Sequence, residues 1–259
     1  MAERAQIAAL ILAFAMLWVP LGQHDFLLEH WMKVGTFMAP FLAFAALAFK
    51  SSDTNWSDAR ILSLGLLIAY IVHQFEEHWV DLYGQTFAFK PYLNSFLSNL
   101  IGQRDGTELI SDASIFVINT SLVWLVGTLA IWKGSQHIFA PLCMAAIVVV
   151  NGISHIGAAG LAGGYNPGLL TAVLVFLPLG IFAYIALLKS GAASAGLVLA
   201  SLLWGLLAHI IMIGGIVLMN RTDVANEVMY FVALISWSIT PAFAFSNDRE
   251  TSARPSGAS

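Results

Sequence analysis

Charged residues are scarce in this chain. They make up 10% of its 259 residues, whereas hydrophobic residues make up 59%. A soluble domain carries about a quarter charged residues. A water-soluble fold of this length cannot bury so much apolar surface. The composition therefore predicts an all-α, polytopic transmembrane helical bundle with the lipid bilayer as its surroundings.

Cysteine is nearly absent as well, because Cys143 is the only one. One thiol cannot form an internal disulfide, and a metal site built from cysteines is excluded. The net charge of −4 is spread thinly, and no basic patch with interleaved aromatic residues occurs. Nucleic acid is therefore a poor candidate partner. No small-x-small cleavage site follows the first apolar run, so we expect that run to be retained as a helix.

Apolar runs close to the roughly 20 residues that a membrane span needs occur eight times. They predict a single transmembrane helical domain over residues 1–246 and a short polar C-terminal tail over residues 247–259. The second run is the shortest and could be re-entrant. In chain order, the eight predicted spans are residues 6–22, 34–49, 59–80, 114–132, 138–161, 169–188, 193–219 and 227–245.

Lysine and arginine are distributed unevenly between the predicted loops. With eight spans, seven of the 11 lie on the side of the N-terminus and four lie on the other side. Cytoplasmic loops carry the excess of positive charge. We therefore expect a multi-pass protein of the cell membrane with both termini in the cytoplasm.

The loop between the third and fourth predicted spans contains a helical pattern of its own. From Phe89 to Ile101, apolar residues recur at three- and four-residue spacing with polar residues between them. This pattern predicts an amphipathic helix lying in the membrane interface. A loop packed against the bundle is the alternative.

Three histidines fall at comparable depth in three predicted spans that run in the same direction. These are His73, His155 and His209. An unpaired ionisable residue within a span costs roughly 2.5 kcal/mol or more, so such residues usually serve a function. Their shared depth predicts one polar cavity that opens outward. Three possible additional site residues lie on the same side of the membrane: His24, Glu29 and His30.

His73 also opens a His-x-x-Glu-Glu motif. Helix positions i, i+3 and i+4 share a face, so His73, Glu76 and Glu77 are expected to project together. One imidazole and two carboxylates suit zinc or non-haem iron. His78 is expected to point away from this face. The alternative is a helix end with two exposed glutamates at the interface, where charge costs less.

Further candidates lie in the fifth and seventh spans and in the turn after the fifth. His155 and His209 could complete a ligand set with the motif. Asn151 lies four residues before His155 and could orient it, or could form a structural helix–helix hydrogen bond. Tyr165, in the Tyr-Asn-Pro-Gly turn at 165–168, could donate a hydrogen bond into the site or could anchor the chain at the interface. The sequence predicts that His73, Glu76, Glu77 and His155 converge within about 5 Å, as shared ligands of one ion must.

The chain resembles the integral membrane proteins that are named for an HXXEE motif. The resemblance rests on His73 with Glu76 and Glu77, on the separate His155, and on the Tyr-x-Pro-Gly turn at 165–168. It covers roughly residues 60–190. The resemblance implies a membrane protein of unassigned biochemical function, so it supports the choice of site residues and leaves the reaction open.

These features predict a membrane-embedded metalloenzyme that acts on a small lipophilic, membrane-dissolved substrate. The expected metal ligands are His73, Glu76, Glu77, His155 and His209, and the expected catalytic residues are Glu77, Tyr165 and His209. Iron with oxidative chemistry is favoured over zinc with hydrolytic chemistry because the carboxylates outnumber what one zinc needs. Two alternatives are a metal-independent His/Glu acid–base isomerase or cyclase of a lipophilic substrate and an ion- or proton-coupled transporter.

Overall fold

The computed structural model describes residues 25–49, 57–103, 106, 108–222 and 225–244. Within these ranges the chain is helical, and its β-structure is limited to one isolated bridge between Val80 and Thr86. The predicted all-α fold is therefore confirmed. The segments in chain order are α2 (Asp25–Phe49), α3 (Ala59–His78), α4 (Phe89–Ile101), α5 (Asp112–Asn119), η1 (Thr120–Leu125), α6 (Val126–Lys133), η2 (Gly134–Gln136), α7 (Phe139–Ala162), α8 (Leu169–Thr171), η3 (Ala172–Phe176), α9 (Leu177–Lys189), α10 (Ala195–Arg221), α11 (Glu227–Ile239) and η4 (Thr240–Ala242).

Five of the described helical stretches are long and apolar enough to cross a membrane. They match the third to seventh predicted spans. The predicted span at 6–22 lies outside the described residues, the span at 34–49 falls within α2, and the last corresponds to the shorter apolar helix Glu227–Ala242. The five stretches are Ala59–His78, Asp112–Lys133, Phe139–Ala162, Leu169–Lys189 and Ala195–Arg221.

The helix α2 differs from the sequence prediction at its start. It begins at Asp25 and not near position 34, and it runs through Pro40 to Phe49 without a break. Charged residues interrupt the apolar pattern in its first turns. The sequence analysis therefore assigned these residues to the loop between the first two predicted spans. Trp31 and Met32 in these turns are buried, so tertiary packing outweighs the local polarity.

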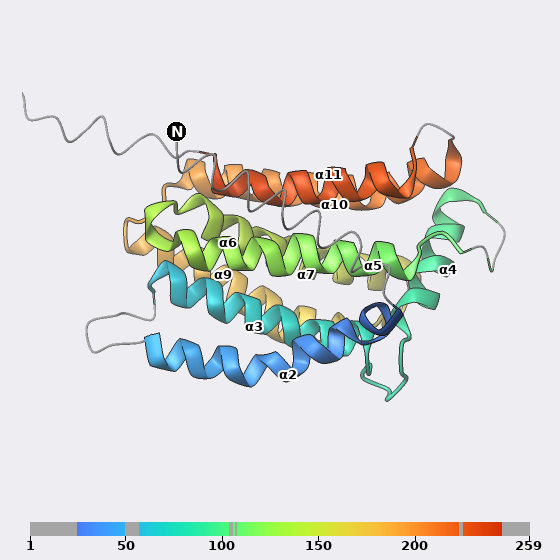
Figure 1. Cartoon of the computed structure of the whole chain (residues 1–259), viewed down its shortest axis with the longest axis horizontal. Helices are drawn as coiled ribbons and strands as arrows, with labels where there is room; N and C mark the ends of the chain where they lie inside the picture. Colours follow the sequence, from blue (N-terminus) through green and yellow to red (C-terminus); the bar gives the residue numbers. More distant parts are fainter. Residues whose placement is uncertain (1–24, 50–56, 104–105, 107, 223–224, 245–259) are drawn as a thin grey trace, which may run out of the picture.

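The amphipathic helix predicted between the third and fourth spans is confirmed as α4, with the predicted bounds. It ends at Gly102, whose positive φ of 66° is a conformation that glycine adopts without steric cost. Asn94 then fixes the returning chain, because its side-chain oxygen accepts hydrogen bonds from the backbone amides of Leu109 and Ile110. Figure 1 shows α4 at one end of the bundle of long helices.

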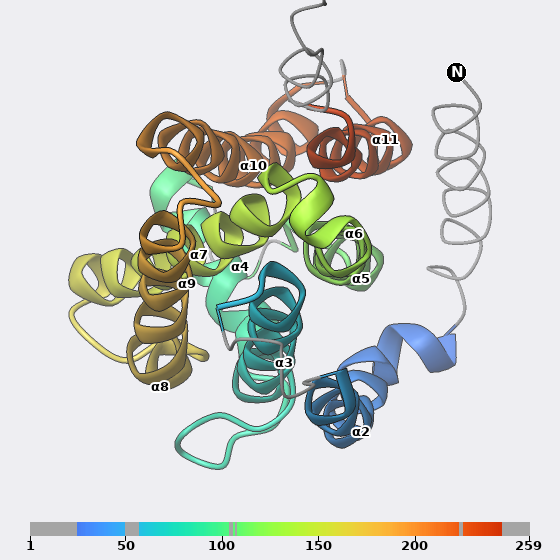
Figure 2. The ribbon, with the colours of Figure 1, turned by 90° about the vertical axis from the view of Figure 1, so that its left-hand side faces the viewer.

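The helix α7 lies inside the bundle, in contact with α3, α6, α9 and α10 (Figure 2). Small residues allow this close packing. A Cβ atom added to Gly205 on α10 would lie 2.9 Å from the Cβ of Ala146, and one added to Gly180 on α9 would lie 2.5 Å from a methyl group of Val149. Both glycines therefore permit helix contacts that a larger residue would prevent. This packing places the end of α3, the second half of α7 and the start of α8 next to one another.

Candidate metal centre

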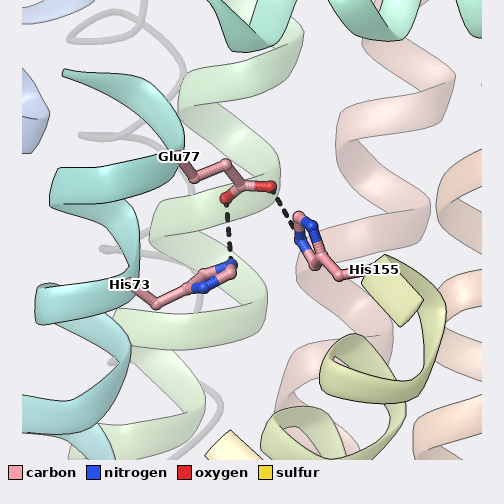
Figure 3. Close-up of side chains that lie close together, drawn as sticks. All are labelled: His73, Glu77 and His155. Carbon is pink, nitrogen blue, oxygen red and sulfur yellow. Dashed lines mark ion pairs between the residues drawn. The ribbon is translucent and has the colours of Figure 1, made fainter. Parts of the chain in front are cut away.

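The carboxylate of Glu77 lies between two buried histidines that come from two helices (Figure 3). Its Oε2 is 3.5 Å from Nε2 of His73, and its Oε1 is 3.2 Å from Nε2 of His155. One ligand atom from each of the three residues lies within 4.8 Å of the others. Two atoms that bind one ion at about 2.0–2.2 Å lie about 3 to 3.5 Å apart, so this group could hold a metal ion.

Thr171 determines which nitrogen of His73 faces Glu77. The Thr171 hydroxyl donates a hydrogen bond of 2.6 Å to Oε2 of Glu76, and its oxygen lies 2.8 Å from Nδ1 of His73. Because the hydroxyl proton is used by the carboxylate, the threonine oxygen accepts from Nδ1–H. In the neutral ring, Nε2 then carries a lone pair toward Glu77. This nitrogen is buried and has no hydrogen-bond partner among the described residues.

Asn166 determines in the same way which nitrogen of His155 faces Glu77. Its amide nitrogen donates to the backbone oxygen of His155 at 2.9 Å, which fixes the orientation of the amide group. Its Oδ1 therefore accepts a hydrogen bond of 2.6 Å from Nδ1–H of His155. The other nitrogen, Nε2, then presents its lone pair to Glu77. Two lone pairs and a carboxylate thus converge, so a proton or a metal ion could bind between them.

Glu76 lies outside this group, although the sequence analysis predicted it as a ligand. Its two oxygens accept hydrogen bonds from the backbone amides of Leu170 and Thr171, at 3.1 and 2.7 Å, and from the hydroxyls of Thr171 and Tyr165. These amides lie in the first turn of the Leu169–Lys189 stretch, where unpaired N–H groups attract an anion. Glu76 therefore anchors the start of this stretch to α3. The predicted convergence of four residues holds for the other three.

The turn at 165–168 packs directly on the motif. The Tyr165 hydroxyl donates to Oε1 of Glu76 at 2.9 Å and accepts from the backbone amide of Leu82 at 3.0 Å. Burial and the neighbouring Glu76 raise the pKa of Tyr165, so it keeps the proton that it donates. Gly168 has a φ of 93°, and a Cβ atom there would lie 2.7 Å from Cε1 of His73 and 2.8 Å from Cε1 of His155. A side chain at this position would therefore displace the histidines.

His78 lies outside the potential metal group, as expected, but it contacts Glu77. Its Nε2 lies 2.9 Å from Oε2 of Glu77 and 3.2 Å from the amide nitrogen of Asn119. The two side chains leave the helix in different directions, but the glutamate chain is long enough to reach back to its neighbour. Edge-to-face contacts with Trp31 and Phe89 hold the imidazole in place. Glu77 is therefore contacted by three histidines, two of which belong to the potential metal group.

The remaining candidates lie apart from the potential metal group. His209 donates from Nδ1 to the backbone oxygen of Gly205 at 2.8 Å, and Asn151 donates to the Tyr70 hydroxyl and not to His155. His30 lies 4.0 Å from the exposed Glu29, and both line a second pocket beside α2. His24 lies outside the described residues.

An apolar cavity of about 360 Å³ adjoins the centre. Its walls come from α3, α4, α5, η1, α7 and α10, and Glu77 and His155 form part of them. Asn151 and His209 line the same cavity but do not belong to the metal group. Because His73 does not line this cavity and most of the lining is apolar, it differs from the polar cavity that the three histidines predicted.

Residues 64–183 match a family model described as a protein of unknown function with HXXEE motif. We call this part of the chain the HXXEE segment. The resemblance seen in the sequence is thereby confirmed, and the HXXEE segment contains the whole His73, Glu77 and His155 group. No curated protein and no solved structure shows significant similarity to the chain.

Two residues of the HXXEE segment were missed by the sequence analysis: Asn166 and Thr171. Both contact a histidine of the centre through its Nδ1 atom. Asn166 is the variable position of the Tyr-x-Pro-Gly turn, so its place in that turn was the available signal. Thr171 lies in an apolar stretch, and nothing in its sequence context distinguishes it from a structural threonine.

Proposed function

We propose that this chain is a membrane-embedded metalloenzyme that acts on a small lipophilic substrate. The observation that supports this most is the buried group of His73, Glu77 and His155 on the wall of an apolar cavity. Buried ionisable groups in a membrane protein are costly, and three that converge on one point favour a functional site. Cavities of about 300–1,000 Å³ with a few convergent polar groups are typical small-molecule sites.

The donor set fits a divalent metal ion. The orphaned Nε2 of His73, the Nε2 of His155 and the Glu77 carboxylate would hold the ion, while Thr171 and Asn166 keep both imidazoles in the required tautomer. Iron would supply oxidative chemistry in such a site, and zinc would supply a Lewis acid for hydrolysis. The surplus of carboxylates that favoured iron disappears because Glu76 is occupied. Two imidazoles and one carboxylate suit both metals.

Around the ion, the chain's own residues prepare the site for chemistry. Gly168 closes one side by its close approach to both imidazoles. His78 contacts Oε2 of Glu77, the oxygen that also faces His73, and restrains the carboxylate. The apolar walls of the cavity exclude water and hold a lipophilic molecule against Glu77 and His155.

Metal analysis of the purified protein tests this proposal. After reconstitution with Fe²⁺ or Zn²⁺, we expect about one ion per chain in the wild type. We expect none in the His73→Ala and His155→Ala variants. His209→Ala is the matched control, because His209 lines the cavity outside the metal group and its loss should leave the metal in place. A wild type that binds neither ion in stoichiometric amount would contradict the proposal.

A metal-independent isomerase or cyclase is a second candidate. It is favoured by the direct contacts of Glu77 with His78 at 2.9 Å and with His155 at 3.2 Å, since protons can bridge both. A catalytic activity that survives chelation and shows a bell-shaped pH profile would support this reading over the first. Transport of an ion or proton by reconstituted liposomes would instead support a transporter.

We also propose a topology of eight spans with α4 in the outer interface and both termini in the cytoplasm. The lysine and arginine distribution and the position of α4 at one end of the bundle support this arrangement. Cys143 is buried and is the only native cysteine. Single cysteines placed in the loops of a Cys143→Ala background can therefore be labelled from either side. Labelling of an α4 cysteine only from inside would contradict the topology.

A further inference from the structure

The apolar cavity narrows the class of substrate that the proposed site would take. At about 360 Å³ it lies at the low end of small-molecule sites. It therefore suits a single-chain or compact lipophile better than a two-chain phospholipid. Most of its lining is apolar, and its polar residues come from α3, α4, α5, α7, α10 and the turn at 165–168.

Two polar groups in this lining lack a hydrogen-bond partner among the described residues, the Tyr92 hydroxyl on α4 and the side-chain oxygen of Asn151 on α7. The Oδ1 atom of Asn151 is buried and has no hydrogen-bond partner in the described part of the chain. The nitrogen of the same amide donates to the hydroxyl oxygen of Tyr70 at 2.5 Å. A buried acceptor without a partner costs free energy, and a ligand with a donor would remove this cost.

Two further polar groups line the same cavity and have hydrogen-bonding capacity left. The Tyr70 hydroxyl accepts from Asn151, so its own proton is still available for donation. His209 uses Nδ1–H for the backbone oxygen of Gly205, which leaves Nε2 as the acceptor nitrogen of the neutral ring. The cavity thus offers acceptors on Asn151 and His209 and a donor on Tyr70.

We propose that the substrate is a lipophilic alcohol whose hydroxyl group binds among Tyr70, Asn151 and His209, beside Glu77 and His155. A hydroxyl donates one hydrogen bond and accepts others, so it matches this mixed set. A carboxylate only accepts and would meet the Glu77 carboxylate and two further acceptors. An ether cannot donate and would leave Oδ1 of Asn151 unpaired. This inference rests on the proposed function, because the alcohol is a substrate only if the site is catalytic. Binding of the alcohol can be tested independently of catalysis.

Two glycines on α7 allow the cavity to be blocked with a matched control. Gly157 lines the cavity, whereas Gly160 does not. At both positions an added Cβ atom would meet no other described atom within 4 Å. A leucine at 157 would therefore extend into the cavity without a backbone clash, and a leucine at 160 would add the same side chain outside it.

The test is competition against tritiated 1-dodecanol bound to the protein in nanodiscs, after removal of metal with a chelator. The unlabelled competitors are 1-dodecanol, its methyl ether, dodecanoic acid and dodecylamine. We expect the alcohol to bind about tenfold more tightly than the ether, about the effect of one hydrogen bond, and more tightly than the acid or the amine. Asn151→Leu and His209→Phe should reduce the preference for the alcohol over the ether. Gly157→Leu should abolish binding, and Gly160→Leu should retain it.

Equal affinity for the alcohol and the ether in the wild type would overturn the inference, as would tighter binding of the acid or the amine. Unchanged alcohol binding in Gly157→Leu would also overturn it. The comparison of ligands on the wild type does not depend on whether any variant folds. Because binding is measured on metal-free protein and metal content is measured separately, failure of this inference is distinguishable from failure of the proposed metal site.

Discussion

Replacing Asn166 with leucine tests the geometry of the metal centre without touching a ligand. Asn166 is 1% exposed and makes two hydrogen bonds to His155, of 2.6 and 2.9 Å. Leucine has the same branched shape and the same number of side-chain heavy atoms but can make neither bond. His155 then loses both its preferred tautomer and its fixed orientation, while Glu77 and His73 keep their own contacts.

The size of the effect follows from the two lost hydrogen bonds. Each contributes about 0.5–1.5 kcal/mol net, so their loss amounts to about 1–3 kcal/mol. Tenfold in affinity corresponds to about 1.4 kcal/mol. We therefore expect metal affinity to fall by about 10- to 100-fold, the range found when an outer partner of a metal-bound histidine is removed.

Titration with Co²⁺, followed by its visible absorption, measures this affinity in the purified protein. Asn151→Leu is the matched control. Asn151 lies four residues before His155 on α7 but donates its hydrogen bond to Tyr70, so the Co²⁺ affinity of this variant should stay within about threefold of the wild type. Equal losses in the two variants, or a larger loss for Asn151→Leu, would refute the assignment of Asn166 as the residue that orients His155.

Three further predictions separate the parts of the motif. Glu77→Gln should lose stoichiometric metal, whereas Glu76→Gln should keep it with at most about tenfold lower affinity. Because Glu76 binds the start of the Leu169–Lys189 stretch, Glu76→Gln should also lower the midpoint of thermal unfolding. Metal analysis and thermal unfolding of both variants check these expectations. Gly168→Ala should weaken metal binding at least about tenfold, because the new Cβ would lie 2.7 Å from His73; equal Co²⁺ affinity would contradict this. Tyr165→Phe should cost about 1–2 kcal/mol of stability with little change in metal affinity, as measured by denaturation and Co²⁺ titration.

Apolar runs and helical periodicity predicted most of the helical architecture, because lipid-facing and core-facing positions are both apolar over a whole span. The bounds of α4 followed from its three- and four-residue spacing and from Gly102 after it. The start of α2 did not follow, since its first turns carry charged residues. These turns pack through Trp31 and Met32, which belong to the hydrophobic core. The spacing of residues within one segment does not show which other elements it will contact.

The sequence also indicated His73, Glu77 and His155, because depth in a span is a simple function of residue count. It could not separate Glu76 from Glu77. Neighbouring positions on a helix differ by about 100° in direction, and only the packing of α3 against α8 and α7 decides which one meets the second histidine. The same angle kept His78 out of the metal group, but the sequence did not show that the flexible Glu77 side chain reaches His78. The role of Thr171 could not be predicted, because it depends on a fold that brings α8 back to α3.

The two glutamates of the motif have different roles that are linked through one chain of hydrogen bonds. Tyr165 and Thr171 both donate to Glu76, and Thr171 accepts from Nδ1–H of His73. The negative charge of Glu76 thereby acts through the Thr171 hydroxyl on the imidazole and favours a lone pair on Nε2, the atom that faces Glu77. A carboxylate outside the metal group can thus raise the basicity of a ligand inside it. The motif and the turn at 165–168 therefore form one unit, because Glu76 needs the turn and the Leu169–Lys189 stretch for its hydrogen bonds, and His73 needs Glu76 for its tautomer.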